Sequence, residues 1–208
     1  MRRTKEDAEQ TRRAILASAM DIFYEKGYSK TTFDEIAKRI NLTKGAVYWY
    51  FRNKPDIVAA LINDFSDCYI EVLNAFLKEY PDMDFDRIIK MELFLNKKIR
   101  EDQQLYKFLF FVTCQMEWSE AIISKIQPCI EQTKQVTRNL FLDALSTLRE
   151  QQKIREDVDI SMICEILMAL YSGLLDAAFK RRLNSEFDTA VENGFNLIFN
   201  SIKTEGVK

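Results

Sequence analysis

Residues 43–54 read TKGAVYWYFRNK, and this stretch decides how the first quarter of the chain is interpreted. Thr43 is a favourable N-cap, so a short helix is expected from Lys44 to about Phe51. Gly45 and Ala46 leave the first turn of this helix almost without side chains. The next turn holds three consecutive large aromatic residues, Tyr48, Trp49 and Tyr50. The stretch therefore predicts a short helix whose first turn is bare and whose second turn is aromatic.

The residues before this stretch predict two more helices. A long helix is expected over residues 5–26, where apolar residues recur on one face. Thr32 and Glu35 then form the S/T-x-x-E pattern of a capping box, which opens a second short helix. Asn41 ends it, because asparagine tolerates the left-handed backbone that a sharp turn needs. The sequence therefore predicts a three-helix head with a helix-turn-helix at about residues 32–51.

The rest of the chain is also expected to be helical. The 208 residues include only 5 glycines and 3 prolines, too few for the many turns of a β-sandwich or barrel, and 47% apolar residues argue against disorder. We predict an all-α protein with a helix-turn-helix domain over residues 1–54 and a second helical domain over residues 55–208. Its expected helices are 54–79, 84–100, 103–117, 119–151 (bent or broken near Pro128), 158–182 and 185–203.

The composition excludes several classes of function. The chain has no histidine, which removes the usual general base and the commonest metal ligand. Its four cysteines are far apart and form no C-x-x-C pair, so we expect reduced thiols rather than a zinc site or disulfides. They are Cys68, Cys114, Cys129 and Cys164. We therefore expect no enzymatic activity, no metal and no cofactor.

The sequence also predicts a cytoplasmic protein that does not enter a membrane. Residues 1–13 are polar and contain no apolar segment of a signal peptide. The most apolar stretch, Ile166 to Leu175, is about half as long as a membrane-spanning helix.

Charge is distributed unevenly along the chain. The net charge is −2, but residues 1–54 hold 12 basic and 7 acidic residues, which gives +5. The remaining 18 basic and 25 acidic residues give −7. A basic head on an acidic body favours a polyanion as the partner of the head alone. Lys44, beside the bare turn, can donate to guanine O6 or N7, and Lys54 at the next helix start can hold a phosphate.

Two consecutive patterns resemble a known family. Residues 23–37 carry F-x-x-x-G-Y-x-x-T-T-x-x-x-I-A, and residues 43–54 carry T-K-G-A-V-Y-W-Y-F-x-x-K. Over about residues 10–62 the chain resembles the DNA-binding head of TetR-family transcriptional repressors, most of all the branch that governs multidrug efflux genes. The resemblance implies an all-helical homodimer on a palindromic double-stranded DNA operator, with a pocket for a small-molecule effector in the C-terminal domain.

The resemblance also implies roles for individual residues. Carried over by position, one group would face bases or nearby sugar-phosphate: Lys44, Gly45, Ala46 and Trp49. A second group would hold the DNA backbone: Thr32, Thr43, Tyr48, Tyr50 and Lys54. The sequence departs from the family pattern at Asn41, where glycine is common, and at Pro55 after the lysine.

The C-terminal domain offers candidates for an effector pocket. Residues 105–118 are apolar on nearly every side, so they either pack in the core or line a cavity. The proposed pocket walls are Phe65, Tyr69, Phe94, Phe111, Cys114, Met116, Trp118 and Met168, with core packing as the alternative for each. Four acids interrupt apolar surroundings: Glu92, Glu117, Glu165 and Asp176. Each can pair with a cationic ligand, form an internal ion pair or lie at a solvated edge.

Two late helices are candidates for a dimer interface. Ala169, Gly173 and Ala177 form a strip of small residues that permits close helix approach. The last helix places Val191, Phe195 and Ile198 on one stripe. Two such helices per subunit can form a symmetric four-helix interface, with packing inside a monomer as the alternative.

The sequence thus favours a ligand-responsive transcriptional repressor, released from its operator by a small apolar or amphipathic effector, with efflux genes as candidate targets. A co-repressor sensor or an activator with the same head is the alternative. Two further alternatives are a helical enzyme, for which the sequence offers no catalytic constellation, and a helical scaffold that contacts only partner proteins.

Overall fold

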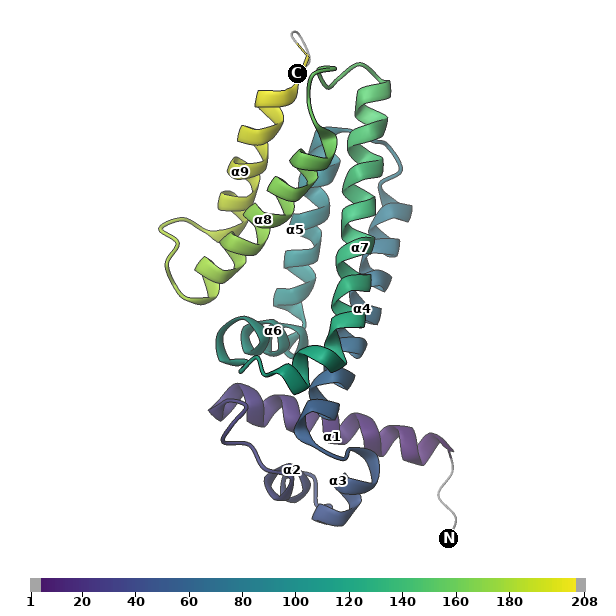
Figure 1. Ribbon diagram of the computed structural model, residues 1–208, viewed down its shortest axis with the longest axis vertical. Coiled ribbons are helices and arrows are strands. Elements are labelled where there is room, and N and C mark those ends of the chain that lie inside the picture. The colour runs from purple at the N-terminus through teal and green to yellow at the C-terminus, as the bar shows by residue number, and fades with distance from the viewer. Residues whose placement is uncertain (1–4, 205–208) are drawn as a thin grey trace. The chain divides into compact units, whose positions relative to one another are not determined.

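The three helices of the head form where the sequence predicts them. The computed structural model describes residues 5–204, and its first helices are α1 (Lys5–Lys26), α2 (Phe33–Arg39) and α3 (Lys44–Tyr50), shown in Figure 1. The capping box of Thr32 and Glu35 is present at the start of α2. At the start of α3, the Thr43 hydroxyl oxygen accepts the backbone N–H of Ala46 at 3.2 Å.

The turn between α2 and α3 depends on a left-handed residue. Asn41 has φ 54°, as its side-chain type predicts. The chain reverses so tightly that the Leu42 N–H donates to the Ala37 carbonyl at 2.8 Å. Asn41 therefore sets the angle at which α3 leaves α2.

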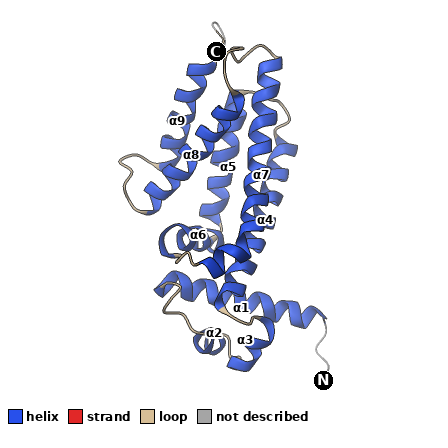
Figure 2. Cartoon of the chain, in the orientation of Figure 1, coloured by secondary structure: helices blue, strands red, loops and turns tan. Residues whose placement is uncertain are grey.

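Six further α-helices follow: α4 (Lys54–Glu79), α5 (Phe85–Glu101), α6 (Gln103–Phe110), α7 (Glu120–Glu150), α8 (Ile160–Phe179) and α9 (Phe187–Ile202). Over residues 5–204 there is no β-strand, and Figure 2 shows helices joined by loops. A single isolated bridge pairs Ile154 with Lys203. The prediction of an all-α protein is confirmed.

One predicted helix boundary is wrong. The helix expected over 103–117 ends at Phe110 and continues as a π-helical turn, η1 (Phe111–Gln115). The wider turn lets the Phe111 ring stack on Phe23 of α1 at 4.9 Å, while the Gln115 amide donates to the Tyr24 carbonyl at 3.0 Å. A bend or a break is expected near Pro128, and α7 continues through this residue without a break.

The chain divides into two compact units that are each discontinuous in sequence. Among the described residues, unit 1 comprises 5–68 with 102–130, and unit 2 comprises 69–101 with 131–204. Unit 1 extends beyond the predicted boundary at Lys54, because the first turns of α4 bury Ile57, Val58 and Leu61 in the core of the head. The functional division after Lys54 stays a prediction, and its outer ends, residues 1–4 and 205–208, lie outside the described residues.

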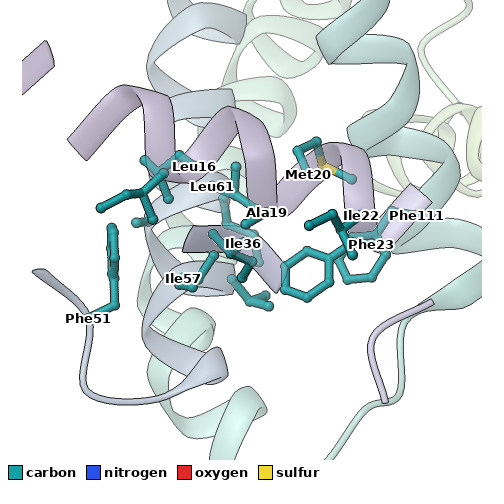
Figure 3. Close-up of a cluster of buried hydrophobic side chains, with 14 of the residues drawn as sticks. Leu16, Ala19, Met20, Ile22, Phe23, Ile36, Phe51, Ile57, Leu61 and Phe111 are labelled. Atoms are coloured by element: carbon teal, nitrogen blue, oxygen red, sulfur yellow. The ribbon is translucent and has the colours of Figure 1, made fainter. Parts of the chain in front are cut away.

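Unit 1 has a core that joins the head to α6 and η1. Figure 3 shows Phe23 beside Phe111, with Ile36 and Ile57 in the same cluster. All four side chains are fully buried. Asp21 of α1 also accepts from the Lys107 ammonium of α6 at 2.6 Å. The head therefore packs directly on the segment that follows α5 in sequence.

Unit 2 buries its own core among α4, α5, α7, α8 and α9. Its fully buried side chains include Phe76, Phe141, Phe195 and Phe199. Helix α8 contains only two charged residues, Glu165 and Asp176. Among the described residues it has the length and composition of a membrane span, although only 11% of that window is buried inside the chain. The apolar stretch is thus twice as long as residues 166–175 suggested.

The left-handed backbone at Asn41 leads to a prediction about the stability of two variants. Replacing Asn41 by alanine should lower the free energy of unfolding by about 1 kcal/mol, because a residue with Cβ is strained at positive φ. Replacing it by glycine should cost little, because glycine adopts this conformation freely. Thermal melts of the full chain at one protein concentration measure both variants. An equal loss for the two would show that the asparagine amide, rather than the backbone, stabilises the turn.

Candidate functional site

Helix α3 exposes the side chains that the sequence assigns to DNA. The helix is anchored by Val47, which is fully buried, while Trp49 is 75% and Tyr48 50% exposed. Lys44 and Gly45 are exposed in the turn before them. The Tyr48 ring leans on Phe33 of α2 at 4.7 Å, and the Lys44 ammonium lies 5.7 Å from the Tyr48 ring centre. This face offers cationic, aromatic and hydrogen-bonding groups together with an almost bare helical turn.

Gly45 is not required by the fold of the chain itself. A Cβ added at this position would meet only the Thr43 hydroxyl oxygen, at 3.9 Å, which is an ordinary contact. Glycine in a helix costs about 0.5–1 kcal/mol relative to alanine. The contacts of the described chain therefore give no reason for glycine rather than alanine at this position.

The environment of Tyr50 differs from the expectation that this residue holds the DNA backbone. Its hydroxyl is buried and has no hydrogen-bond partner in the described chain, so in this conformation it is not presented to a phosphate. The ring meets Trp49 edge-on at 4.6 Å, and both line a surface hollow with Ala8 and Ala46. Tyr50 therefore supports Trp49 from behind, because the short helix cannot expose all of its aromatic residues.

Lys54 is held by the head rather than pointing outwards. Its ammonium donates to the carbonyls of Tyr28 at 2.7 Å and Ser29 at 3.2 Å and lies 4.3 Å from the Tyr28 ring centre. Burial lowers the pKa of this ammonium. Two of its three N–H groups thus join α4 to the loop after α1, and one is left for a phosphate. The phosphate contact of Lys54 stays a prediction.

The two threonines at helix starts are both engaged in caps. The Thr32 hydroxyl donates to the Glu35 carboxylate at 2.8 Å, and Thr43 caps α3. Both side chains are nevertheless exposed, so their remaining hydrogen-bonding capacity faces solvent.

The cations of the head fall into two classes. Five pair with carboxylates of the head or of α4: Arg12, Arg13, Lys26, Lys38 and Arg39. Four exposed cations of the described head have no carboxylate partner, namely Lys5, Lys30, Lys44 and Arg52. Sequence reasoning did not single out Lys5, Lys30 and Arg52, because half of the pairings that neutralise the other cations join different helices. These four are the charges of the described head that remain for a polyanion.

The eight predicted pocket residues are distributed over both units. Phe65, Phe111, Cys114, Met116 and Trp118 belong to unit 1, and Tyr69, Phe94 and Met168 to unit 2. Phe111 is a core residue, fully buried against Phe23, while Trp118 is 48% exposed. A cavity of about 210 Å³ within unit 1 is lined in part by Phe65, with Leu105 and Phe108. The assignment of these residues to one effector pocket stays a prediction.

The four acids that interrupt apolar sequence have different environments. Glu117 accepts from the Ser29 hydroxyl, Asp176 pairs with Lys180, and Glu165 is exposed. Glu92 alone among them is buried, at 3% exposure, with no hydrogen bond or ion pair in the described chain. Burial raises the pKa of its carboxyl to about 8. Glu92 is therefore largely neutral at pH 7.

The predicted dimer residues are partly corrected by the structure. Val191 and Phe195 are fully buried in the core of unit 2, because the apolar stripe of α9 faces its own chain. Ile198 is half-buried against the same core, so it is at most a margin of an interface.

The small-residue strip of α8, by contrast, lies on an exposed face. Ala169 and Gly173 are exposed and Ala177 is half-buried. Ile166 at 41% and Met162 at 54% exposure extend the same face one and two turns earlier, respectively. A Cβ at Gly173 would meet nothing within 4 Å. On α9, Leu197 is 75% exposed and was missed by the sequence analysis, because it lies off the apolar stripe.

The raised pKa of Glu92 predicts how the stability of the folded chain changes with pH. Its pKa is raised from 4.5 to about 8 on folding, so its neutral form is favoured in the folded state. The stability that this group contributes is fully present below pH 4.5 and falls by about 1.4 kcal/mol per pH unit until about pH 8. Replacing Glu92 by glutamine should remove this fall. In thermal melts from pH 5 to pH 8, the melting temperature of the variant should rise relative to the unmodified chain.

The exposed Glu165 provides the control for this measurement. Glu165→Gln removes a carboxyl from α8 without touching the buried one, so its melting temperature should follow that of the unmodified chain at every pH. A constant difference between Glu92→Gln and the unmodified chain over the same range would contradict the burial of an unpaired carboxyl.

Comparison with known proteins identifies the head. Residues 15–61 match the model of bacterial regulatory proteins of the tetR family. The HTH-type transcriptional regulator TtgR of Pseudomonas putida is 39% identical over 75 residues, so the match spans only 36% of this chain and 36% of TtgR. The HTH-type transcriptional repressor BepR of Brucella suis is 27% identical over 184 residues, which are 85% of this chain and 84% of BepR.

Solved structures share the fold over nearly the whole chain. NalD of Pseudomonas aeruginosa, described as the secondary repressor of the MexAB-OprM multidrug efflux pump, superposes with a TM-score of 0.77 at 23% identity, covering 97% of this chain and all of that one. SmeT in complex with triclosan gives a TM-score of 0.76 at 22% identity, covering 96% and 94%. The head of this chain thus matches the model of tetR-family regulatory proteins, and the chain is similar over most of its length to a repressor and to solved structures with the same fold.

Proposed function

We propose that the protein is a ligand-responsive transcriptional repressor that binds a palindromic DNA operator as a homodimer. The observation that carries the proposal is the outer face of α3, where an exposed Lys44, a glycine that the fold does not need and a 75%-exposed Trp49 lie on one short helix. A protein that kept α3 only for packing would have no reason to keep these three residues together.

The proposed contacts follow from this face. The first turn of α3 enters the major groove, where Gly45 and Ala46 let the backbone approach base edges and Lys44 donates to guanine O6 or N7. The Trp49 indole N–H reaches a phosphate at the groove wall. The unpaired cations Lys30 and Arg52 add phosphate contacts at the rim.

The exposed face of α8 supports a homodimer. Met162, Ile166, Ala169 and Gly173 form an apolar strip about three turns long, and the small residues let a second copy of α8 approach closely. A symmetric pairing would bury this strip. Binding to successive major grooves of one operator would then require the two α3 helices to lie about 34 Å apart.

The names of relatives support the response to an effector and the choice of target genes. NalD is described as the repressor of an efflux pump, BepR is named as a repressor, and SmeT was solved with triclosan. We infer a small apolar or amphipathic effector for this protein, bound in the helical body, and efflux genes as its targets. An effector that prefers a conformation with a different spacing of the heads lowers operator affinity by its differential affinity for the two states.

The decisive experiment is an unbiased selection of double-stranded oligonucleotides at moderate salt, followed by binding titrations on the selected sequence. The full chain should enrich a palindrome, and added effector should release it. Enrichment of no sequence would reject the proposal, and tighter binding on adding effector would favour a co-repressor sensor instead.

The same titrations test the role of Gly45. Gly45→Ala should lower operator affinity at least tenfold, because the added methyl occupies the bare turn that meets the base edges. Its stability should be unchanged or higher by up to about 1 kcal/mol, since the site has room for a Cβ. Ser146→Ala, on an exposed turn of α7, is the control. Unchanged operator affinity for Gly45→Ala would remove this turn from the interface.

The dimer is tested at Gly173. Gly173→Leu should weaken dimerisation at least tenfold, because a leucine side chain holds apart the two helices that the small residues bring together. The folded monomer should persist, since nothing in the described chain lies within 4 Å of this Cβ position. Ser146→Leu adds the same side chain outside the proposed face. Sedimentation that shows an intact Gly173→Leu dimer at low micromolar concentration would place the interface elsewhere.

A further inference from the structure

Unit 2 contains a carboxyl that its fold does not explain. Glu92 lies in the middle of α5, is 3% exposed and has no hydrogen bond or ion pair in the described chain. Desolvation is the cause of its raised pKa, and no nearby cation offsets it. A leucine or methionine at this position would fill the core without this cost. The residue therefore lowers the stability of the free protein.

A second polar group one turn along α5 is also incompletely satisfied. Asn96 is 3% exposed, and its carbonyl oxygen accepts the hydroxyl of Tyr171 from α8 at 2.5 Å. Its amide nitrogen is buried and has no partner in the described chain. Residues four apart lie on one face of a helix, so Glu92 and Asn96 face the same side of α5. That face presents an acceptor and a donor, both without partners.

The surroundings of these two groups are aromatic and carry no cation that pairs with them. Tyr69 of α4 and Tyr171 of α8 are titratable neighbours of Glu92: burial raises the pKa of both phenols, and the Glu92 charge raises it further. Tyr69 is itself hydrogen-bonded to Thr137 of α7 at 2.8 Å. Arg100 and Asp188 reach only Tyr171, and they pair with each other at 2.8 Å. Within residues 5–204, no cation is thus placed to neutralise Glu92.

Three side chains at the border of the cluster are only partly buried. Tyr69 and Tyr171 are half-buried, as is Met168, one turn before Tyr171 on α8. Two of these three, Tyr69 and Met168, are among the predicted pocket walls. Aromatic and thioether side chains around a few convergent polar groups are typical of small-molecule sites.

We propose that Glu92 and Asn96 form the polar anchor of the effector site and select an amphipathic amine, whose ammonium binds the Glu92 carboxylate while an acceptor atom of the ligand binds the Asn96 amide. This inference rests on the proposed function, since it names the chemical class of the effector. The ligand's apolar body would pack on Tyr69, Met168 and Tyr171. Binding supplies the counter-charge that the free protein lacks, so the cation and the ionised form of Glu92 stabilise each other.

The test uses three fluorescent probes that share a dansyl group and a five-carbon chain. Dansylcadaverine ends in an ammonium, N-acetyl-dansylcadaverine in a neutral amide, and dansyl-6-aminohexanoic acid in a carboxylate. Each is titrated into the full chain at pH 7 and pH 9, and dansyl fluorescence reports binding without reference to DNA. The ammonium probe should bind at least tenfold more tightly than the other two at pH 9.

The pH dependence and two variants separate an ion pair from general apolar binding. Affinity for the ammonium probe should rise about tenfold from pH 7 to pH 9, because Glu92 ionises over this range. Glu92→Gln should abolish both the preference and its pH dependence, and Asn96→Leu should weaken the ammonium probe while keeping the pH dependence. Glu165→Gln, which removes an exposed carboxyl of α8, should behave as the unmodified chain.

The outcomes distinguish this inference from the proposed function. Equal affinity for the three probes, or a preference that survives Glu92→Gln, would overturn it even if the protein binds an operator and an unrelated effector releases it. Selective binding of the ammonium probe that Glu92→Gln abolishes would support the amine site, and failure of the chain to select any operator would then count against the proposed function alone.

Discussion

The stacking of Phe23 on Phe111 is the contact on which unit 1 depends. Phe23 comes from α1 and is fully buried, so the same side chain contributes to the core beneath α2 and α3 and to the contact with η1. The Lys107–Asp21 ion pair and the Gln115–Tyr24 hydrogen bond lie along the same two segments. A displacement of η1 would therefore also displace α1, on which α2 and α3 of the head pack. An effector acting on the segment after α5 has a direct mechanical connection to that head.

The head could be read closely from the sequence because its signals are local. The Thr32–Glu35 capping box, the Thr43 cap and the left-handed Asn41 each depend on backbone geometry within a few residues, and the structure has all three. The direction of a side chain is a different matter. Lys54 was expected to face a phosphate, but the carbonyls that hold its ammonium lie 25 and 26 residues earlier, and no local pattern predicts their position.

The C-terminal domain was harder to predict, because an apolar face of a helix does not show whether it packs within its own chain or against a second chain. Val191 and Phe195 were assigned to a dimer interface and instead pack inside unit 2, while the exposed Leu197 attracted no attention. Small residues were more informative, since Ala169 and Gly173 lie on the exposed face of α8. The sequence marks Glu92 as an acid in apolar surroundings, yet it does not distinguish a buried unpaired carboxyl from an internal ion pair or a carboxyl at a solvated edge. Only the tertiary structure shows that no partner is supplied.

The π-helical turn has a consequence for how related sequences align. Such a turn holds one residue more than the α-helical turn that it replaces, and it lies at Phe111–Gln115. Losing a single residue there would convert the segment to regular α-helix and rotate every later side chain of that helix by about 100°. A relative shorter by one residue in this segment would thus present a different set of side chains to its first helix, and pairing residues across that gap by sequence alone would match positions that are not equivalent in space.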